Sequence, residues 1–188
     1  MINMLKVLIA VFVLIMLLAL ATLGKDIKKW FVYRITKKSP VESLWIILIT
    51  LTLLIVITIA DFIKNKPKPE GIMITGLFMF FLGGIMQIIV KKKVNITLQE
   101  KMKTAFNKIT TTGIYSKIRH PSKLAGLMMI IGLCLALKSL WGIIILITLF
   151  LPGLFYKIHQ EEKILLDEYG ERYFEYQDKT KKLIPKIL

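Results

Sequence analysis

Five long apolar blocks dominate the sequence and leave few folds open to the chain. They cover residues 7–23, 43–60, 71–90, 124–137 and 140–156. The first three are long enough to cross the hydrocarbon core of a bilayer, about 30 Å thick, as α-helices. The last two are shorter, and only Lys138 and Ser139 separate them, which predicts a tight helical hairpin. We therefore predict an all-α integral membrane protein with about five transmembrane helices.

The first apolar block has a second interpretation. Residues 19–21, Ala-Leu-Ala, resemble a signal-peptide cleavage site. Cleavage would leave a basic segment with six Lys or Arg residues between positions 25 and 38 outside the cytoplasm. Such a segment resists translocation, which favours a retained helix over a signal peptide.

The charges fall between the apolar blocks, and the net charge is +15. Residues 25–40, residues 91–123 and the tail after residue 156 are basic, whereas residues 61–70 and the hairpin turn carry little net charge. The positive-inside rule then places the N-terminus outside and the C-terminus, with the three basic regions, in the cytoplasm. We expect these lysines to meet anionic membrane lipids, and we expect no nucleic-acid partner because no soluble module is left to bind one.

The remaining segments divide the chain into two parts. Residues 1–90 hold three predicted transmembrane helices and a basic cytoplasmic loop, and residues 91–188 hold a surface segment, the hairpin at 122–157 and a C-terminal tail. In the surface segment, apolar residues alternate with polar ones over 94–112, which favours a short strand or hairpin. Helical spacing of apolar and tyrosine residues over 159–177 predicts a cytoplasmic amphipathic helix that Gly170 interrupts. Pro152 predicts a kink in the fifth helix.

Two groups of ionisable residues flank the hairpin. The first group, before it, is Arg119, His120 and Lys123, and the second, after it, includes Lys157, Glu161 and Glu162. A tight hairpin brings the two groups side by side. Adjacent carboxylates close to a bilayer need cationic partners or a ligand, so this end of the hairpin is the candidate site. A lysine at a helix end, such as Lys157, also has a simpler role as an interfacial anchor.

Several other chemistries lack their motifs. The single cysteine, Cys134, supports neither a disulfide framework nor a cysteine-rich metal site, and the two histidines lack zinc-binding spacing. We therefore expect no metal. The sequence also contains no phosphate-binding loop, no glycine-rich dinucleotide fingerprint and no nucleophile-elbow motif.

The motifs on either side of the hairpin resemble those of the isoprenylcysteine carboxyl methyltransferase family, whose wider group includes phospholipid N-methyltransferases. The resemblance rests on "GIYSKIRHP", an apolar helix pair, and "EEKILLDEYGERYFEYQDKTKKLIP", in that order over residues 113–185. It implies an integral membrane enzyme that uses S-adenosylmethionine. The cofactor would bind in a cytoplasmic pocket made by the hairpin and the tail, and a lipophilic small molecule or lipidated substrate would enter from the bilayer.

The resemblance also implies roles for individual residues. Glu161 and Glu162 match the paired carboxylates that would contact the amino-acid moiety of the cofactor or orient the acceptor. Lys157 stands where the family has arginine, and it keeps the charge but not the bidentate fork. Lys123 replaces a family tyrosine, and Gly126 lies one place after the expected glycine. The implied cofactor-binding residues are Tyr115, Arg119, His120, Pro121, Lys123, Gly126, Glu161, Glu162, Tyr169 and Tyr173, and the implied catalytic residues are Lys157 and Glu162.

The predicted function is therefore methyl transfer from S-adenosylmethionine to a membrane-embedded acceptor: a prenyl-cysteine-like carboxylate, a thiol or a lipid amine. Two alternatives stay open. An NADPH-dependent membrane reductase of the sterol-reductase type shares a similar helix pair and tail, and the extra lysines suit a 2′-phosphate. A non-enzymatic membrane scaffold that kept the fold would tolerate Lys123 and Lys157.

Overall fold

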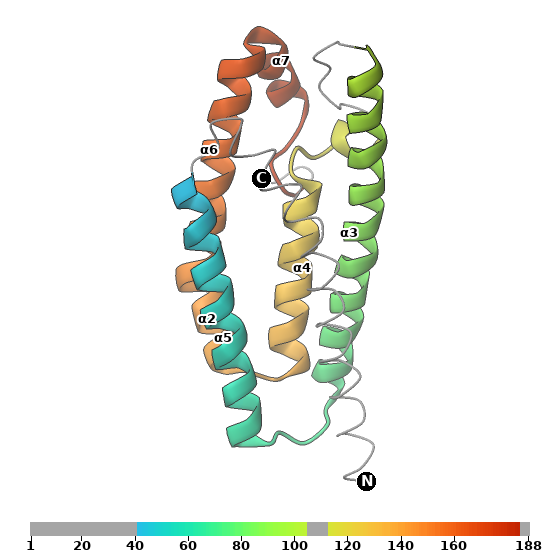
Figure 1. Cartoon of the computed structure of the whole chain (residues 1–188). Helices are drawn as coiled ribbons and strands as arrows, with labels where there is room; N and C mark the ends of the chain where they lie inside the picture. The colour runs from blue at the N-terminus through green and yellow to red at the C-terminus, as the bar shows by residue number, and fades with distance from the viewer. Residues whose placement is uncertain (1–40, 105–112, 185–188) are drawn as a thin grey trace. The chain divides into compact units, whose positions relative to one another are not determined.

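The computed structural model describes residues 41–104 and 113–184, which belong to one unit of the chain, Val41–Leu188 (Figure 1). Its elements are α2 (Val41–Asn65), α3 (Gly71–Thr104), the short 3-10 helix η1 (Gly113–Ser116), α4 (Pro121–Ala136), α5 (Leu140–Ile145), the π-helical stretch η2 (Leu146–Phe150), α6 (Leu151–Tyr169) and α7 (Glu171–Lys179). Within the described ranges the prediction of an all-helical chain is confirmed. The first apolar block and its signal-peptide alternative lie outside the described residues.

Three helical segments are long and apolar enough to cross a membrane: Trp45–Asn65, Gly71–Lys92 and Leu140–Tyr169. Helix α4 is a shorter apolar helix, as the length of its block predicts. Many large apolar side chains point outward; Ile74 and Phe78 of α3 are 72% and 70% exposed. Exposed apolar surface of this extent suits lipid rather than water. The described residues therefore indicate a multi-pass membrane protein.

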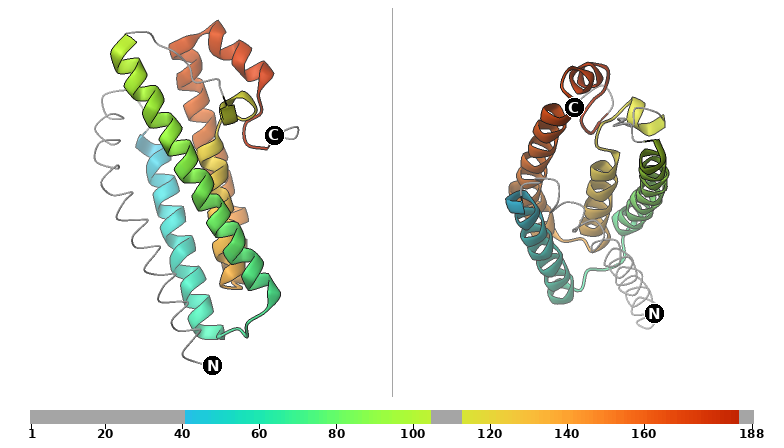
Figure 2. Two further views of the ribbon diagram at one scale, coloured as in Figure 1. Left: turned by 90° about the vertical axis from the view of Figure 1, so that its right-hand side faces the viewer. Right: turned by 45° about the horizontal axis from the view of Figure 1, so that its top comes forward.

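Helices α3 and α4 run antiparallel and in close contact (Figures 1 and 2). A Cβ atom added to Gly76 would lie 2.3 Å from the backbone nitrogen of Ala136, and one added to Gly132 would lie 2.5 Å from that of Phe80. Glycines at such contacts let two helix backbones approach closely, which is the usual way that helices associate in lipid.

Helix α2 packs instead along α5 and α6 (Figure 1). A Cβ atom on Gly142 would meet the Thr58 hydroxyl, and one on Gly153 would lie 3.2 Å from Ile46. The two helix groups share one apolar core, whose buried members are Leu54, Cys134, Ile145, Leu146, Phe150, Leu154, Ile158 and Leu183. Pro152 lacks a backbone N–H, and the helix accommodates it directly after the π-helical turn η2.

The predicted tight turn between α4 and α5 is confirmed, although it has three residues, 137–139, instead of two. Lys138 adopts a left-handed backbone conformation with φ of 48°, and Ser139 caps α5 by accepting a hydrogen bond from the Gly142 N–H at 3.0 Å. The Ser139 hydroxyl also donates to Asp61 at 2.7 Å, and the Lys138 ammonium pairs with Glu70. These contacts fix the turn to the connection between α2 and α3.

The strand prediction for the surface segment is wrong over residues 94–104, because these residues continue α3 to Thr104. At 1.5 Å per residue this 34-residue helix is about 51 Å long, well beyond the thickness of a bilayer core. The lysine, glutamine, glutamate and methionine residues here are good helix formers, and a short strand would need a pairing partner. Residues 105–112 lie outside the described residues.

The C-terminal tail confirms the predicted helical region and its interruption. Helix α6 ends at Tyr169, Gly170 has a positive φ of 55°, and α7 follows at once. Glycine adopts this backbone conformation without the steric cost that other residues bear. The tail can therefore turn back toward the start of α4.

Candidate functional site

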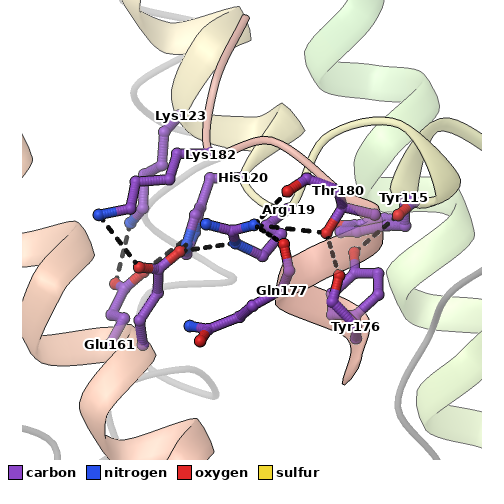
Figure 3. A network of polar contacts seen from close by, with 10 residues as sticks. Tyr115, Arg119, His120, Lys123, Glu161, Tyr176, Gln177, Thr180 and Lys182 are labelled. Atoms are coloured by element: carbon purple, nitrogen blue, oxygen red, sulfur yellow. Dashed lines mark hydrogen bonds and ion pairs between the residues drawn. The ribbon is translucent and has the colours of Figure 1, made fainter. Parts of the chain in front are cut away.

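The hairpin brings the start of α4 beside the middle of α6, as the sequence predicts (Figure 3). Arg119 and His120 immediately precede α4, Lys123 lies in its first turn, and Glu161 and Glu162 lie on α6. The Arg119 Nε donates to the Glu162 Oε1 at 2.8 Å, and the Lys123 Nζ lies 3.0 Å from the Glu161 Oε1. Two segments about 40 residues apart in sequence thus meet through paired opposite charges.

His120 lies between the two carboxylates. Its Nε2 is 3.3 Å from the Glu162 Oε1, and its Nδ1 is 3.8 Å from the Glu161 Oε2. The side chain is only 8% exposed, yet within the described ranges its Nε2 has no aligned hydrogen-bond partner. A buried polar atom without an aligned partner is uncommon in proteins, and it marks a position where a ligand or water can complete the bonding.

The tail closes the site through main-chain pairing. A short parallel bridge joins Ile118 and Lys181, in which the Arg119 N–H donates to the Lys181 carbonyl at 2.7 Å and the Lys181 N–H to the Lys117 carbonyl at 3.1 Å. Beside the bridge, the His120 N–H donates to the Lys182 carbonyl at 3.0 Å. This pairing places the Lys182 Nζ 3.5 Å from the Glu162 Oε2. Lys182 was missed by sequence reasoning. Lys182 directly precedes the end of the motif, but nothing in the local sequence indicates that the tail pairs with the segment before α4.

Arg119 has a second set of contacts besides Glu162. Its terminal nitrogen donates to the Gln177 carbonyl at 2.9 Å and to the Thr180 carbonyl, at the C-terminal end of α7. The last carbonyls of a helix lack partners within the helix and carry partial negative charge, so a cation is favourable at this end of α7. Arg119 therefore joins α6 to the tail, a task that the planar guanidinium fork performs and a lysine does not.

Three tyrosines pack beside this junction. The Tyr176 hydroxyl donates to the Tyr115 carbonyl at 2.7 Å, and the buried Tyr173 ring lies against Tyr176. Burial raises the pKa of Tyr115 and raises that of Tyr176 to about 12. Burial, with the nearby Glu162 carboxylate, also raises the pKa of Tyr173. The Tyr173 hydroxyl has no aligned hydrogen-bond partner within the described ranges. Each of these shifts favours the neutral phenol over the phenolate.

The other predicted site residues lie around this cluster. Pro121 is buried and begins α4, where its missing N–H costs no hydrogen bond. Gly126 borders open space, because an added Cβ would meet nothing within 4 Å. Lys157 is 5% exposed and lies one turn before Glu161 on α6. Tyr169 ends α6, about two turns beyond Glu162, and is thus the predicted site residue farthest from Glu162 along that helix.

Among the described residues, no group of three or more His, Cys, Asp or Glu side chains could hold a metal ion. The site is instead a mixed cluster of cations and carboxylates at one end of the helices. We call Arg119, His120, Lys123, Glu161, Glu162 and Lys182 the polar cluster.

Comparison with known families gives one match. The model of the phospholipid methyltransferase family matches residues 72–172, just over half of the chain. The matched stretch runs from the start of α3 to the start of α7 and includes every polar-cluster residue except Lys182. A comparison with curated proteins finds no match. The chain therefore belongs to the phospholipid methyltransferase family, and it is a membrane methyltransferase that uses S-adenosylmethionine and acts on a lipid-type acceptor.

Proposed function

We propose that the polar cluster binds the amino-acid moiety of S-adenosylmethionine and that the acceptor is a lipid amine in the bilayer. The observation that carries this proposal is the convergence on Glu162 of Arg119, His120 and Lys182, which come from two distant segments of the chain. A buried cluster with both signs of charge suits a ligand that itself carries both signs.

The residues present fit the cofactor. It carries an ammonium, a carboxylate and a sulfonium that supplies an electrophilic methyl group. Glu161 and Glu162 offer carboxylates to the ammonium, while Lys123, Lys182 and His120 offer positive or hydrogen-bonding groups to the carboxylate. The His120 Nε2 and the Tyr173 hydroxyl have no aligned hydrogen-bond partner within the described ranges, so both atoms keep capacity to bond a ligand.

Each predicted site residue has a place in this proposal. Arg119 holds the tail against α6, Pro121 fixes the start of α4, and Tyr115 and Tyr173 support the tail. Gly126 borders open space that a bulkier residue would fill, and Tyr169 positions the turn into α7. Methyl transfer needs close positioning of donor and acceptor more than strong acid–base chemistry, so a well-anchored frame supports it.

Lys157 and Glu162 are the residues that we assign to the acceptor side. Lys157 lies deeper along the membrane-spanning α6 than the polar cluster, where the headgroup of a lipid would approach from the bilayer. A buried ammonium there suits the phosphate of a phospholipid headgroup. Glu162 orients the reacting amine with its carboxylate, and the ammonium form of the amine loses its proton to water before the nitrogen lone pair attacks the methyl group.

A lipid amine is favoured over the other acceptors for two reasons. The family match is to phospholipid methyltransferases. Lys157, in place of arginine, also lacks the fork that would hold a prenyl-cysteine-like carboxylate with two bonds. The motif resemblance over residues 113–185 keeps the prenyl-cysteine-like carboxylate as the second candidate. The basic segments on either side of the spans support a cytoplasmic site with the N-terminus outside.

The test is a thermal-shift experiment in detergent, followed by an activity assay. We expect S-adenosylmethionine and its demethylated product to raise the melting temperature, and NADPH to leave it unchanged. Labelled methyl should then pass to phosphatidylethanolamine in mixed micelles and not to a farnesyl-cysteine analogue. Transfer to the analogue alone would select the second candidate. Transfer to neither acceptor, or S-adenosylmethionine binding that Glu162→Gln leaves unchanged, would reject the proposal.

A further inference from the structure

We propose that Lys182, with Lys123 beside it, forms an anion-binding subsite at the edge of the polar cluster. It would take a carboxylate or phosphate group of a bound ligand. The inference rests on the proposed function and names a residue that lies outside the family match.

The polar cluster carries an excess of positive charge. Arg119, Lys123 and Lys182 carry three positive charges, against two negative charges on Glu161 and Glu162, so one positive charge is in excess even when His120 is neutral. Glu162 alone faces Arg119 at 2.8 Å, the His120 Nε2 at 3.3 Å and Lys182 at 3.5 Å. A single carboxylate balances only one of the two permanent cations, Arg119 and Lys182. An excess positive charge close to a low-dielectric region attracts an anion.

Lys182 is the cation of the polar cluster that can turn most readily to a ligand. Arg119 is 8% exposed, and it already contacts Glu162 and the carbonyls of Gln177 and Thr180. Lys182 makes the longest of the Glu162 contacts, and its side chain is 39% exposed. Lys123 is 21% exposed. The ammonium of Lys182 can therefore turn to a ligand while Arg119 keeps the Glu162 carboxylate paired.

The fold itself fixes the position of Lys182. The Lys182 carbonyl accepts the His120 N–H at 3.0 Å, and the next residue, Leu183, is 2% exposed within the apolar core. The main chain of the tail is thus held on both sides of the Lys182 side chain. The His120 Nε2, buried and without an aligned partner in the described part of the chain, lies against the same carboxylate.

The anion that Lys182 would bind has two possible sources. The carboxylate of the cofactor's amino-acid moiety is one, and the phosphate of the acceptor's headgroup is the other. A lysine ammonium is a mobile point charge that suits either anion, without the fixed geometry that a guanidinium imposes.

The test compares Lys182→Met with Lys181→Met. Lys181 is the adjacent residue on the same tail segment, its side chain is exposed, and its removal changes the net charge equally. One assay measures by calorimetry the Kd of S-adenosylhomocysteine and of 5′-methylthioadenosine, which lacks the amino-acid moiety. The other measures the KM for phosphatidylethanolamine in mixed micelles at saturating cofactor.

If the anion is the carboxylate of the cofactor, Lys182→Met weakens S-adenosylhomocysteine binding about tenfold or more and leaves 5′-methylthioadenosine binding unchanged. If the anion is the lipid phosphate, the KM rises by a similar factor and the Kd stays constant. In both cases Lys182→Arg restores most of the loss and Lys181→Met has little effect. Lys182→Gln, which keeps much of the side-chain length, repeats the test should the methionine variant fold poorly.

Unchanged Kd and KM in folded Lys182→Met and Lys182→Gln would overturn the subsite, as would equal losses in Lys181→Met. Failure of the proposed function gives a different result, because the wild-type protein would then transfer no methyl group to phosphatidylethanolamine, or Glu162→Gln would bind S-adenosylhomocysteine as tightly as the wild-type protein does.

Discussion

The helical hairpin carries a polar network at each end, and the two networks differ in how completely they are satisfied. At the turn, Ser139 is fully buried, donates to Asp61 and accepts from the Gly142 N–H, and Lys138 pairs with Glu70. At the other end, Glu162 faces more cations than it can balance, and the buried His120 Nε2 lacks an aligned partner in the described part of the chain.

The difference separates a structural network from a binding network. Polar groups that satisfy one another leave nothing for a ligand, and their role is to fix α2 and α3 to the turn. A network with excess charge and unused hydrogen-bonding capacity is complete only when another molecule joins it. Both networks occur at the ends of membrane-spanning helices, so position alone would not distinguish them.

The largest expected effect comes from exchanging the central carboxylate. We expect Glu162→Gln to lower methyl transfer at least about a hundredfold, because Arg119, His120 and Lys182 lose their shared anion next to the reacting groups. Leaving these cations unpaired should also cost roughly 3–5 kcal/mol of stability. The measurements are labelled methyl transfer and thermal melting.

The matched control is Asp61→Asn at the turn. It removes a carboxylate that accepts from Ser139 and Asn65. We expect it to lower the melting temperature while cofactor affinity stays constant. Equal losses of affinity in the two variants would contradict the distinction between the networks.

The second prediction concerns Arg119, which joins both parts of the site. Arg119→Lys keeps the charge but cannot reach Glu162, the Gln177 carbonyl and the Thr180 carbonyl together. We expect the tail to loosen, at a cost of about 2 kcal/mol for the lost charged hydrogen bonds. Limited trypsin digestion measures this, because Lys179, Lys181 and Lys182 are cleavage sites in the tail. A tail as resistant as that of the wild-type protein would show that Arg119 acts mainly on the ligand.

These contacts also show which parts of the structure could be predicted from sequence. The apolar blocks and the tight turn are local signals, and they were sufficient to place Arg119 and His120 beside Glu161 and Glu162. The pairing of Ile118 with Lys181 has no local signal, because it joins main-chain atoms over sixty residues apart. Lys182 was therefore missed. The alternation of Val94, Ile96 and Leu98 was misleading, because a short amphipathic pattern does not determine whether a strand has a partner.

The third prediction returns to the turn. Ser139→Ala removes the cap of α5 and the bond to Asp61, and we expect a loss of about 1 kcal/mol in stability. The affinity for S-adenosylmethionine should stay within error of the wild-type value, because the turn lies at the opposite end of α4 from the polar cluster (Figure 1). Calorimetry in detergent checks both quantities, and a fall in affinity would show that the ends are coupled through α4.

The smallest effect is expected at Tyr176, whose hydroxyl donates to the Tyr115 carbonyl. Its pKa is raised to about 12, chiefly by burial, so the folded protein favours the neutral phenol. The stability that this group contributes is therefore complete below pH 10, the usual pKa of tyrosine, and is lost as the pH rises toward 12. Tyr176→Phe should cost about 1 kcal/mol at neutral pH and should weaken the fall in melting temperature above pH 10. Melting curves from pH 8 to pH 11 measure both effects. Because burial also raises the pKa of Tyr173, part of the fall in melting temperature above pH 10 should remain in Tyr176→Phe. If the whole fall remains, the effect belongs to Tyr173 and not to Tyr176.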